Sequence, residues 1–195
     1  ADGALRSIVG NNTFAGAVTL SSAARINSAA DTLTLSNTVT SAGHALTVGG
    51  SGDTPLSATL NLGTGTLTKD GAGTLLFSGT TGTVGQVSLA AGTLSIGGST
   101  TLNTAEFASS ATTTLTIASG GTVAASYAAT NTDFNGSLAG AGIFAATGTA
   151  ANAGLTFGTT FSASALTRQV GSTTIGSSDL NDYFTVRFGS GVGIT

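Results

Sequence analysis

Short alternations of apolar and polar residues run along the chain, and Gly, Asn, Asp or Ser interrupts each of them. Alternation with a period of two is typical of a β-strand that buries one face, and the interrupting residues are typical of turns. The strands predicted in this way recur at intervals of about 8 to 12 residues. They are Ala17–Leu20, Ala24–Asn27, Thr32–Ser36, Ala45–Val48, Ala58–Leu62, Thr66–Thr68, Thr74–Phe77, Val87–Leu89, Thr93–Ile96, Thr114–Ile117, Thr122–Ala124, Gly142–Ala145, Leu155–Phe157, Ser164–Thr167 and Tyr183–Phe188.

Two phrases of the sequence are related to each other, Leu67–Gly79 and Val87–Gly98. Each is a pair of short strands separated by a Gly-rich turn, and each contains Gly-Thr-Leu. Repeats of this kind stack coil upon coil into a solenoid, with about 20 to 30 residues per coil. The sequence therefore predicts an all-β chain that forms one parallel β-helix over residues 1–195. The repeats are clearest over 31–124, and 130–195 is expected to hold degenerate coils and a terminal cap or assembly element.

Composition narrows the class of protein further. Hydrophobic residues make up 40% of the chain and mean hydropathy is +0.36, so there is enough apolar material for a core. Charged residues make up only 7%, and the net charge is −3 with five Lys and Arg, which excludes a surface that tracks phosphates; we expect no nucleic-acid partner. No uninterrupted apolar run approaches the ~18 residues of a membrane-spanning helix, so no membrane-spanning segment is predicted.

Residue usage also bears on compartment. The chain has no Cys and only one Lys, and it is rich in Thr, Ser, Ala, Gly and Asn, a composition typical of secreted bacterial surface proteins. It begins at Ala1-Asp2, a start that suits a mature chain after removal of a signal peptide. The predicted location is extracellular or on the cell surface.

The clearest repeat carries a family resemblance. Leu67–Gly79 reads Leu-x-Lys-x-Gly-x-Gly-Thr-Leu-x-Phe-x-Gly, and a second Gly-Thr-Leu phrase follows at Gly92–Gly97. Together they resemble the passenger-associated repeat of bacterial autotransporters, with weaker echoes over about half of the chain. The resemblance implies an extracellular right-handed β-helix of a Gram-negative bacterium, either a passenger-like piece or a stand-alone secreted relative, and it carries no catalytic residues.

Few residues offer catalytic or metal-binding chemistry. His44 is the only histidine and precedes a predicted strand, so we interpret it as a turn residue. Asp179 and Asp182 form the only close acidic pair, and we interpret them as turn or cap residues, with weak calcium binding as the alternative. Gly49–Asp53 is similar to one calcium-binding nonapeptide, but such solenoids need tandem copies. We therefore predict no enzyme, no cofactor and no metal site.

One run of threonines stands out, Thr112, Thr114 and Thr116. Alternate threonines lie on one face of a strand, and flat threonine arrays occur in ice-binding solenoids. Thr is frequent throughout this chain, however, and only this run is long. Ice binding therefore stays a minor alternative at this point.

The favoured function is a structural subunit of an extracellular bacterial filament or surface fibre. The two ends of a β-helix carry unpaired backbone groups, and docking of identical ends satisfies them and builds an open polymer. The predicted partners are copies of the chain itself, together with a cell surface or matrix. The alternative is a monomeric autotransporter-like passenger or adhesin module that binds a surface, matrix or sugar. The candidate assembly strands lie at the head and tail, at Leu5, Ile8, Val9, Tyr183, Phe184, Val186, Phe188, Val192 and Ile194.

Overall fold

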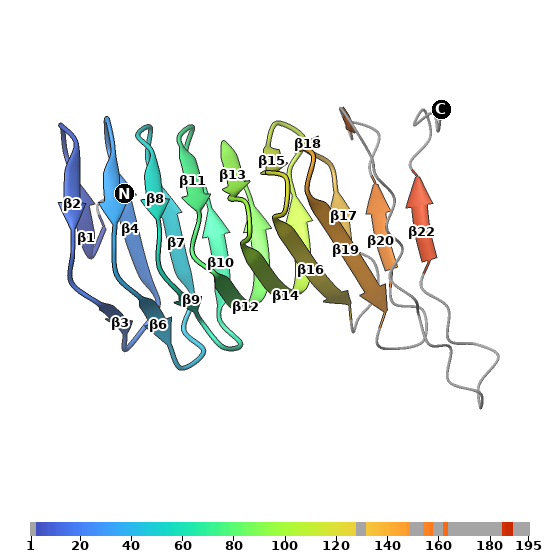
Figure 1. The fold of residues 1–195 in the computed structure, drawn as a ribbon, viewed down its shortest axis with the longest axis horizontal. Helices are drawn as coiled ribbons and strands as arrows, with labels where there is room; N and C mark the ends of the chain where they lie inside the picture. Colours follow the sequence, from blue (N-terminus) through green and yellow to red (C-terminus); the bar gives the residue numbers. More distant parts are fainter. Residues whose placement is uncertain (1–2, 128–131, 149–153, 158–161, 164–184, 189–195) are drawn as a thin grey trace.

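The computed structural model describes residues 3–127, 132–148, 154–157, 162–163 and 185–188, and every regular element within them is a β-strand. Consecutive strands do not pair with each other. Each instead pairs in parallel with the strand one coil further along the chain. The chain therefore winds as a parallel β-solenoid of about seven turns, the right-handed β-helix expected from the sequence. The coils follow one another along the long axis of the molecule (Figure 1).

The strands stack into three faces, which we number by their order along a coil. The first face holds β1 (Leu5–Ser7), β4 (Ala24–Ser28), β7 (Leu46–Gly49), β10 (Thr66–Lys69), β17 (Thr132–Phe134), β20 (Gly154–Phe157) and β22 (Thr185–Phe188). The second face holds β2 (Asn12–Phe14), β5 (Leu33–Leu35), β8 (Thr54–Leu56), β11 (Thr74–Phe77), β13 (Thr93–Ile96), β15 (Thr114–Ile117), β18 (Ser137–Gly140) and β21 (Ser162–Ala163). The third face holds β3 (Val18–Leu20), β6 (Val39–Ser41), β9 (Leu60–Asn61), β16 (Thr122–Tyr127) and β19 (Ile143–Gly148).

Two long strands join the third face of one coil to the first face of the next. They are β12 (Thr81–Leu89) and β14 (Thr101–Ser109). The first half of β12 pairs with β9, and its second half pairs with β10. The pairing between β12 and β14 is interrupted at Gly85, which donates its N–H to the Gly65 carbonyl at 2.9 Å. The corner between the two faces lies at this residue.

The core fills the inside of the coils, and the alternation along each strand decides which residues enter it. On the second face, Leu75 stacks on Leu94 and then on Leu115, and all three are at most 1% exposed. The residues that alternate with these leucines along each strand point outward and are half-buried. Since each inward position repeats about every 20 to 25 residues, one apolar residue per coil is enough to build a continuous core.

Aromatic rings fill the interior further along the chain. Phe107 and Phe134 stack with ring centroids 5.6 Å apart, and Phe144 meets Phe107 edge-on at 5.6 Å. Tyr127 is fully buried and donates its hydroxyl to the Phe107 carbonyl at 3.3 Å. Phe134 pairs with Ser109 in the register and continues its inward-facing column, so this ring belongs to the core.

The candidate assembly strands are only partly described. β1 ends at Ser7, so Ile8 and Val9 lie in the following turn and not in a strand, contrary to the expectation. Val186 and Phe188 belong to β22, which continues the first face by pairing with β20. Tyr183, Phe184, Val192 and Ile194 lie outside the described residues, as do Asp179, Asp182 and the strand predicted at 164–167.

No helix among the described residues is long and apolar enough to cross a membrane.

Candidate functional site

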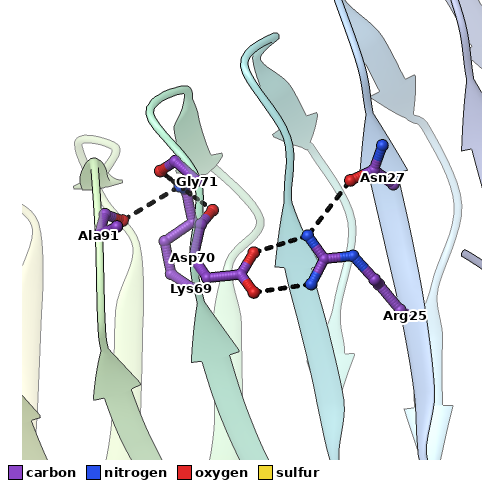
Figure 2. Close-up of polar contacts among 6 residues, drawn as sticks. All are labelled: Arg25, Asn27, Lys69, Asp70, Gly71 and Ala91. Carbon is purple, nitrogen blue, oxygen red and sulfur yellow. Dashed lines mark hydrogen bonds and ion pairs between the residues drawn. The ribbon is translucent and has the colours of Figure 1, made fainter. Parts of the chain in front are cut away.

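A lysine occupies a core position at the end of β10. In the register of the first face, Lys69 follows Val48 and precedes Leu89, so its side chain enters the interior and only 2% of it is exposed. Its Nζ donates to three main-chain carbonyls, those of Asp70 at 2.7 Å, Gly71 at 2.9 Å and Ala91 at 3.3 Å (Figure 2). Lys69 therefore holds together the turns of two successive coils. Burial lowers the pKa of this ammonium group from 10.5 to about 8.

An ion pair crosses the outside of the same face. The Arg25 guanidinium on β4 donates two hydrogen bonds to the Asp70 carboxylate, both 2.7 Å long, and a third to Asn27 Oδ1 at 3.2 Å (Figure 2). The pair passes over the intervening coil at Gly49, the last residue of β7. A Cβ at Gly49 would collide with the Asp70 carboxylate and lie 2.6 Å from Arg25 Nη2. Three coils are thus fastened together where a glycine leaves room.

The charges of this pair shift each other's ionisation. Hydrogen bonding from Arg25 holds the pKa of Asp70 below its usual range, and the Asp70 carboxylate raises the pKa of Arg25. A depressed carboxyl pKa stabilises the fold at neutral pH, and this contribution is lost as the pH falls from about 4 through the lowered pKa. The side chains are 22% and 36% exposed, so water screens part of the attraction.

Replacing Asp70 by Asn tests this ion pair. We expect Asp70→Asn to lower the free energy of unfolding by about 1 kcal/mol at pH 7, because a partly exposed bidentate pair is lost. Urea denaturation at pH 7 and near pH 2 measures the effect, and the two proteins should converge at the acid pH. A difference of the same size at both pH values would contradict a contribution from the carboxylate charge.

An open hollow of about 450 Å³ lies beside the ion pair. Since the Arg25 and Asp70 charges are paired, the hollow has no excess charge from these two residues. Besides Arg25 and Asp70, its lining consists of Arg6 and of main chain and short side chains from the first face and the following turns, namely Asn27, Ala29, Gly50, Ser51 and Gly71. The ion pair beside the hollow, together with Lys69, fastens coils to one another.

Those residues considered for catalysis or metal binding that the structure describes are not brought together. His44 lies half-buried in the turn before β7, where its main-chain N–H donates to Ser41 Oγ at 2.6 Å. Asp53 belongs to the segment Gly49–Asp53, which is similar to a calcium-binding nonapeptide. Its carboxylate accepts a hydrogen bond from the N–H of Thr74 at 2.8 Å. Within the part of the chain that the structure describes, no group of three His, Cys, Asp or Glu is placed to hold a metal ion.

Among the described strands, none pairs with the outer side of the first coil, which is formed by β1, β2 and β3. We call these three strands, with the turn residues Ile8 and Val9, the open end. Ile8 is 66% exposed and Val9 69% exposed, and they are the large hydrophobic residues that the described part of the chain leaves on its surface. They line a second hollow of about 390 Å³ with apolar residues of the first two coils, including Leu5, Phe14 and Leu33. The expected assembly residues Leu5, Ile8 and Val9 thus lie together.

Sequence reasoning missed the ion pair and the role of the lysine. Arg25 and Asp70 are 45 residues apart, and only the register of two complete coils brings them together. Lys69 is part of the repeat phrase, but the sequence does not show that it links two coils. This link depends on the next coil, because Ala91 supplies one of the three carbonyls that accept from Lys69. The signal available in the sequence was a lysine at an inward-facing position where the neighbouring coils have an apolar residue.

These features define a class of fold, a parallel β-solenoid. No protein-family model, curated protein or solved structure matches the chain significantly. The resemblance of Leu67–Gly98 to the autotransporter passenger repeat therefore stays a prediction.

Proposed function

We propose that this solenoid is a structural subunit of an extracellular bacterial filament or surface fibre, and that copies of it assemble through the open end. The observation that carries the proposal is the unpaired side of the first coil. Among the described strands, β2 pairs only with β5 and β3 only with β6. Exposed edges of this kind are templates for pairing with another chain.

Backbone hydrogen bonds identify the groups that face outward along this edge. Asn12 donates its N–H to the Thr32 carbonyl at 2.8 Å, and the Phe14 carbonyl accepts from Ser36 at 3.2 Å. Successive residues of a strand direct their backbone groups to opposite sides, so the N–H and C=O of Thr13 point away from β5. Thr19 has the same position on β3, because Val18 donates to the Thr38 carbonyl.

Apolar surface lies next to these backbone groups. Ile8 and Val9 are exposed, and Leu5 and Phe14 are only partly covered although they pack against the core. A further β-coil laid on this end would pair the backbone edges and bury the apolar side chains together. At the far end of the described residues, β22 pairs only with β20. Two unlike ends that stack head to tail build an open fibre.

The polar contacts between coils support a role based on cohesion and not on catalysis. The charged groups of Lys69, Arg25 and Asp70 on the first face form contacts between coils. The second candidate function is a monomeric passenger or adhesin module, which the repeat phrase at Leu67–Gly79 favours. The two candidates differ in whether purified protein forms fibres.

Replacing Thr13 of the edge strand β2 by proline distinguishes the two candidate functions. Thr13→Pro removes the N–H that points outward and keeps the bonds of Asn12 and Phe14 to β5, and proline is tolerated on edge strands. We expect wild-type protein to form fibres by electron microscopy and to sediment faster as its concentration rises. Thr13→Pro should remain a folded monomer under the same conditions.

Thr13→Val is the matched control, because it changes the same exposed side chain but keeps the N–H, and it should form fibres. Circular dichroism confirms that each variant keeps its β-structure. Wild-type protein that stays monomeric at every concentration would contradict the proposal, as would fibres of Thr13→Pro that match those of the wild type.

A further inference from the structure

The third face carries two parallel rows of short polar side chains that point outward. The register of β3, β6, β9, the first half of β12, the first half of β14 and β16 aligns them from coil to coil. One row is Thr38, Thr59, Thr81, Thr101 and Thr122, and the other is Thr19, Thr40, Asn61, Thr83 and Asn103. Each of these residues is exposed or half-buried. The rows extend over most of the described coils.

The array is held rigid from below and from the side. The residues between the two rows point inward, and Val39, Leu60, Leu102 and Val123 are at most 1% exposed. Asn103 Nδ2 donates to the Gly82 carbonyl of the preceding coil at 3.2 Å. Because the backbone ladder fixes each coil against the next, the outward groups repeat at about 4.8 Å along the stack and about 6.7 Å across it.

Charged residues are segregated away from this face. Among the described residues they lie either on strands of the first face or between the first and second faces, at Arg6, Arg25, Asp31, Asp53, Lys69, Asp70, Glu106, Asp133 and Arg187. A strongly hydrated charge in the rows would disturb any regular layer of water above them. The segregation therefore favours a partner that is itself uncharged and periodic.

The second face is less regular. Its outward rows include Thr32, Thr34, Thr114 and Thr116, but Asp53, Pro55 and Leu76 interrupt them. The threonine run noticed in the sequence, Thr112 to Thr116, begins in a turn and continues on this interrupted face. The longer array of the third face is invisible to a local search, because its members lie about one coil apart in the sequence.

We propose that the third face binds the surface of ice. Each threonine presents a hydroxyl that can replace a water molecule of the lattice and a methyl group that orders the water beside it. The spacing of the coils is close to the repeat of oxygen atoms along a row on the ice surface. Sugar-binding and protein-binding surfaces are usually built on exposed aromatic rings or Arg, and the described part of this face offers neither.

Uptake into a slowly growing ice front tests the proposal, with a co-dissolved inert protein as the reference. Wild-type protein should be enriched in the ice. Thr83→Lys places a charge in the middle of the array, and we expect about tenfold lower enrichment because central contacts dominate a binding surface. Thr59→Lys tests a second coil in case Thr83→Lys fails to fold. Circular dichroism checks the fold of both.

Thr112→Lys is the matched control, since Thr112 is exposed but lies outside the third face, and it should be enriched like the wild type. Three results would overturn the proposal: wild-type protein excluded from ice like the reference, folded Thr83→Lys and Thr59→Lys enriched like the wild type, or Thr112→Lys as defective as they are. Binding to microcrystalline polysaccharide without uptake into ice would also overturn it, in favour of a sugar ligand.

Discussion

Replacing Gly50 by Ala is expected to destabilise the solenoid by about 4 kcal/mol or to prevent folding. Gly50 lies in the turn after β7 with φ of 112°, a backbone conformation that a residue with a Cβ adopts only under strain. The added methyl group would also collide with the Ser28 carbonyl of the preceding coil. That carbonyl accepts the N–H of Gly52 at 3.0 Å, so it cannot move without losing a hydrogen bond. Urea denaturation followed by circular dichroism measures the loss.

Gly63→Ala is the matched control. Gly63 also has a positive φ, of 57°, but the nearest atom to its added Cβ would be 3.6 Å away. Only the conformational cost then remains, about 1 kcal/mol. Equal losses in the two variants would show that contact between coils does not limit the side chain at Gly50.

Changing Lys69 is expected to have the second largest effect. Lys69→Met keeps most of the buried stem but removes the donor to the carbonyls of Asp70, Gly71 and Ala91. Leaving these groups unsatisfied should cost about 2 kcal/mol. Lys69→Ala also removes the stem and leaves a cavity between Val48 and Leu89, which should raise the loss to about 4 kcal/mol. Thr68→Ala, an outward neighbour, should change stability by less than about 0.5 kcal/mol.

The lysine also predicts a pH dependence. Its pKa is about 8 in the folded protein and 10.5 ordinarily, so the unfolded chain binds more protons between these values. The stability of the wild type should therefore rise relative to Lys69→Met as the pH increases from 8 towards 10. Urea midpoints of both proteins across this range measure the difference. A difference that stays constant from pH 7 to pH 10 would contradict a buried ammonium group with a lowered pKa.

The strands with the clearest alternation were predicted best. Thr74–Phe77, Thr93–Ile96 and Thr114–Ile117 have the same bounds in the structure as in the prediction. Each is a Thr-Leu-x-apolar segment between Gly-rich or Ser-rich turns, so the alternation of apolar residues and the flanking turn residues predict the same strand bounds.

The long strands could not be found in this way. β14 was missed over its whole length and β12 over its first half, since small residues such as Ala105 and Gly82 hide the alternation. Gly82 is an inward position where a Cβ would lie 2.8 Å from Leu102 and 2.7 Å from Phe77. A small residue is thus required by contacts across the interior and with the next coil, and single-sequence periodicity contains no information about those contacts.

The two proposed activities use different parts of the molecule. Assembly depends on the end of the solenoid, where Thr13 and Thr19 present backbone groups, whereas ice binding depends on the side chains of the third face. Thr19 contributes to both, as its hydroxyl lies 3.5 Å from that of Thr40. Stacking would lengthen the threonine rows, and a longer flat array binds a crystalline surface more tightly by adding sites. Either activity can fail without the other.

Amide hydrogen exchange at the open end is the most direct test of the central claim, that this end is a pairing edge. The Thr13 and Thr19 amides should exchange rapidly in dilute protein and become protected at high concentration, when another coil covers them. The amides of Asn12 and Val18 already bond to the Thr32 and Thr38 carbonyls and should be protected in both cases. Equal and rapid exchange of Thr13 and Thr19 at every concentration, in protein that sediments as a single species, would contradict the account.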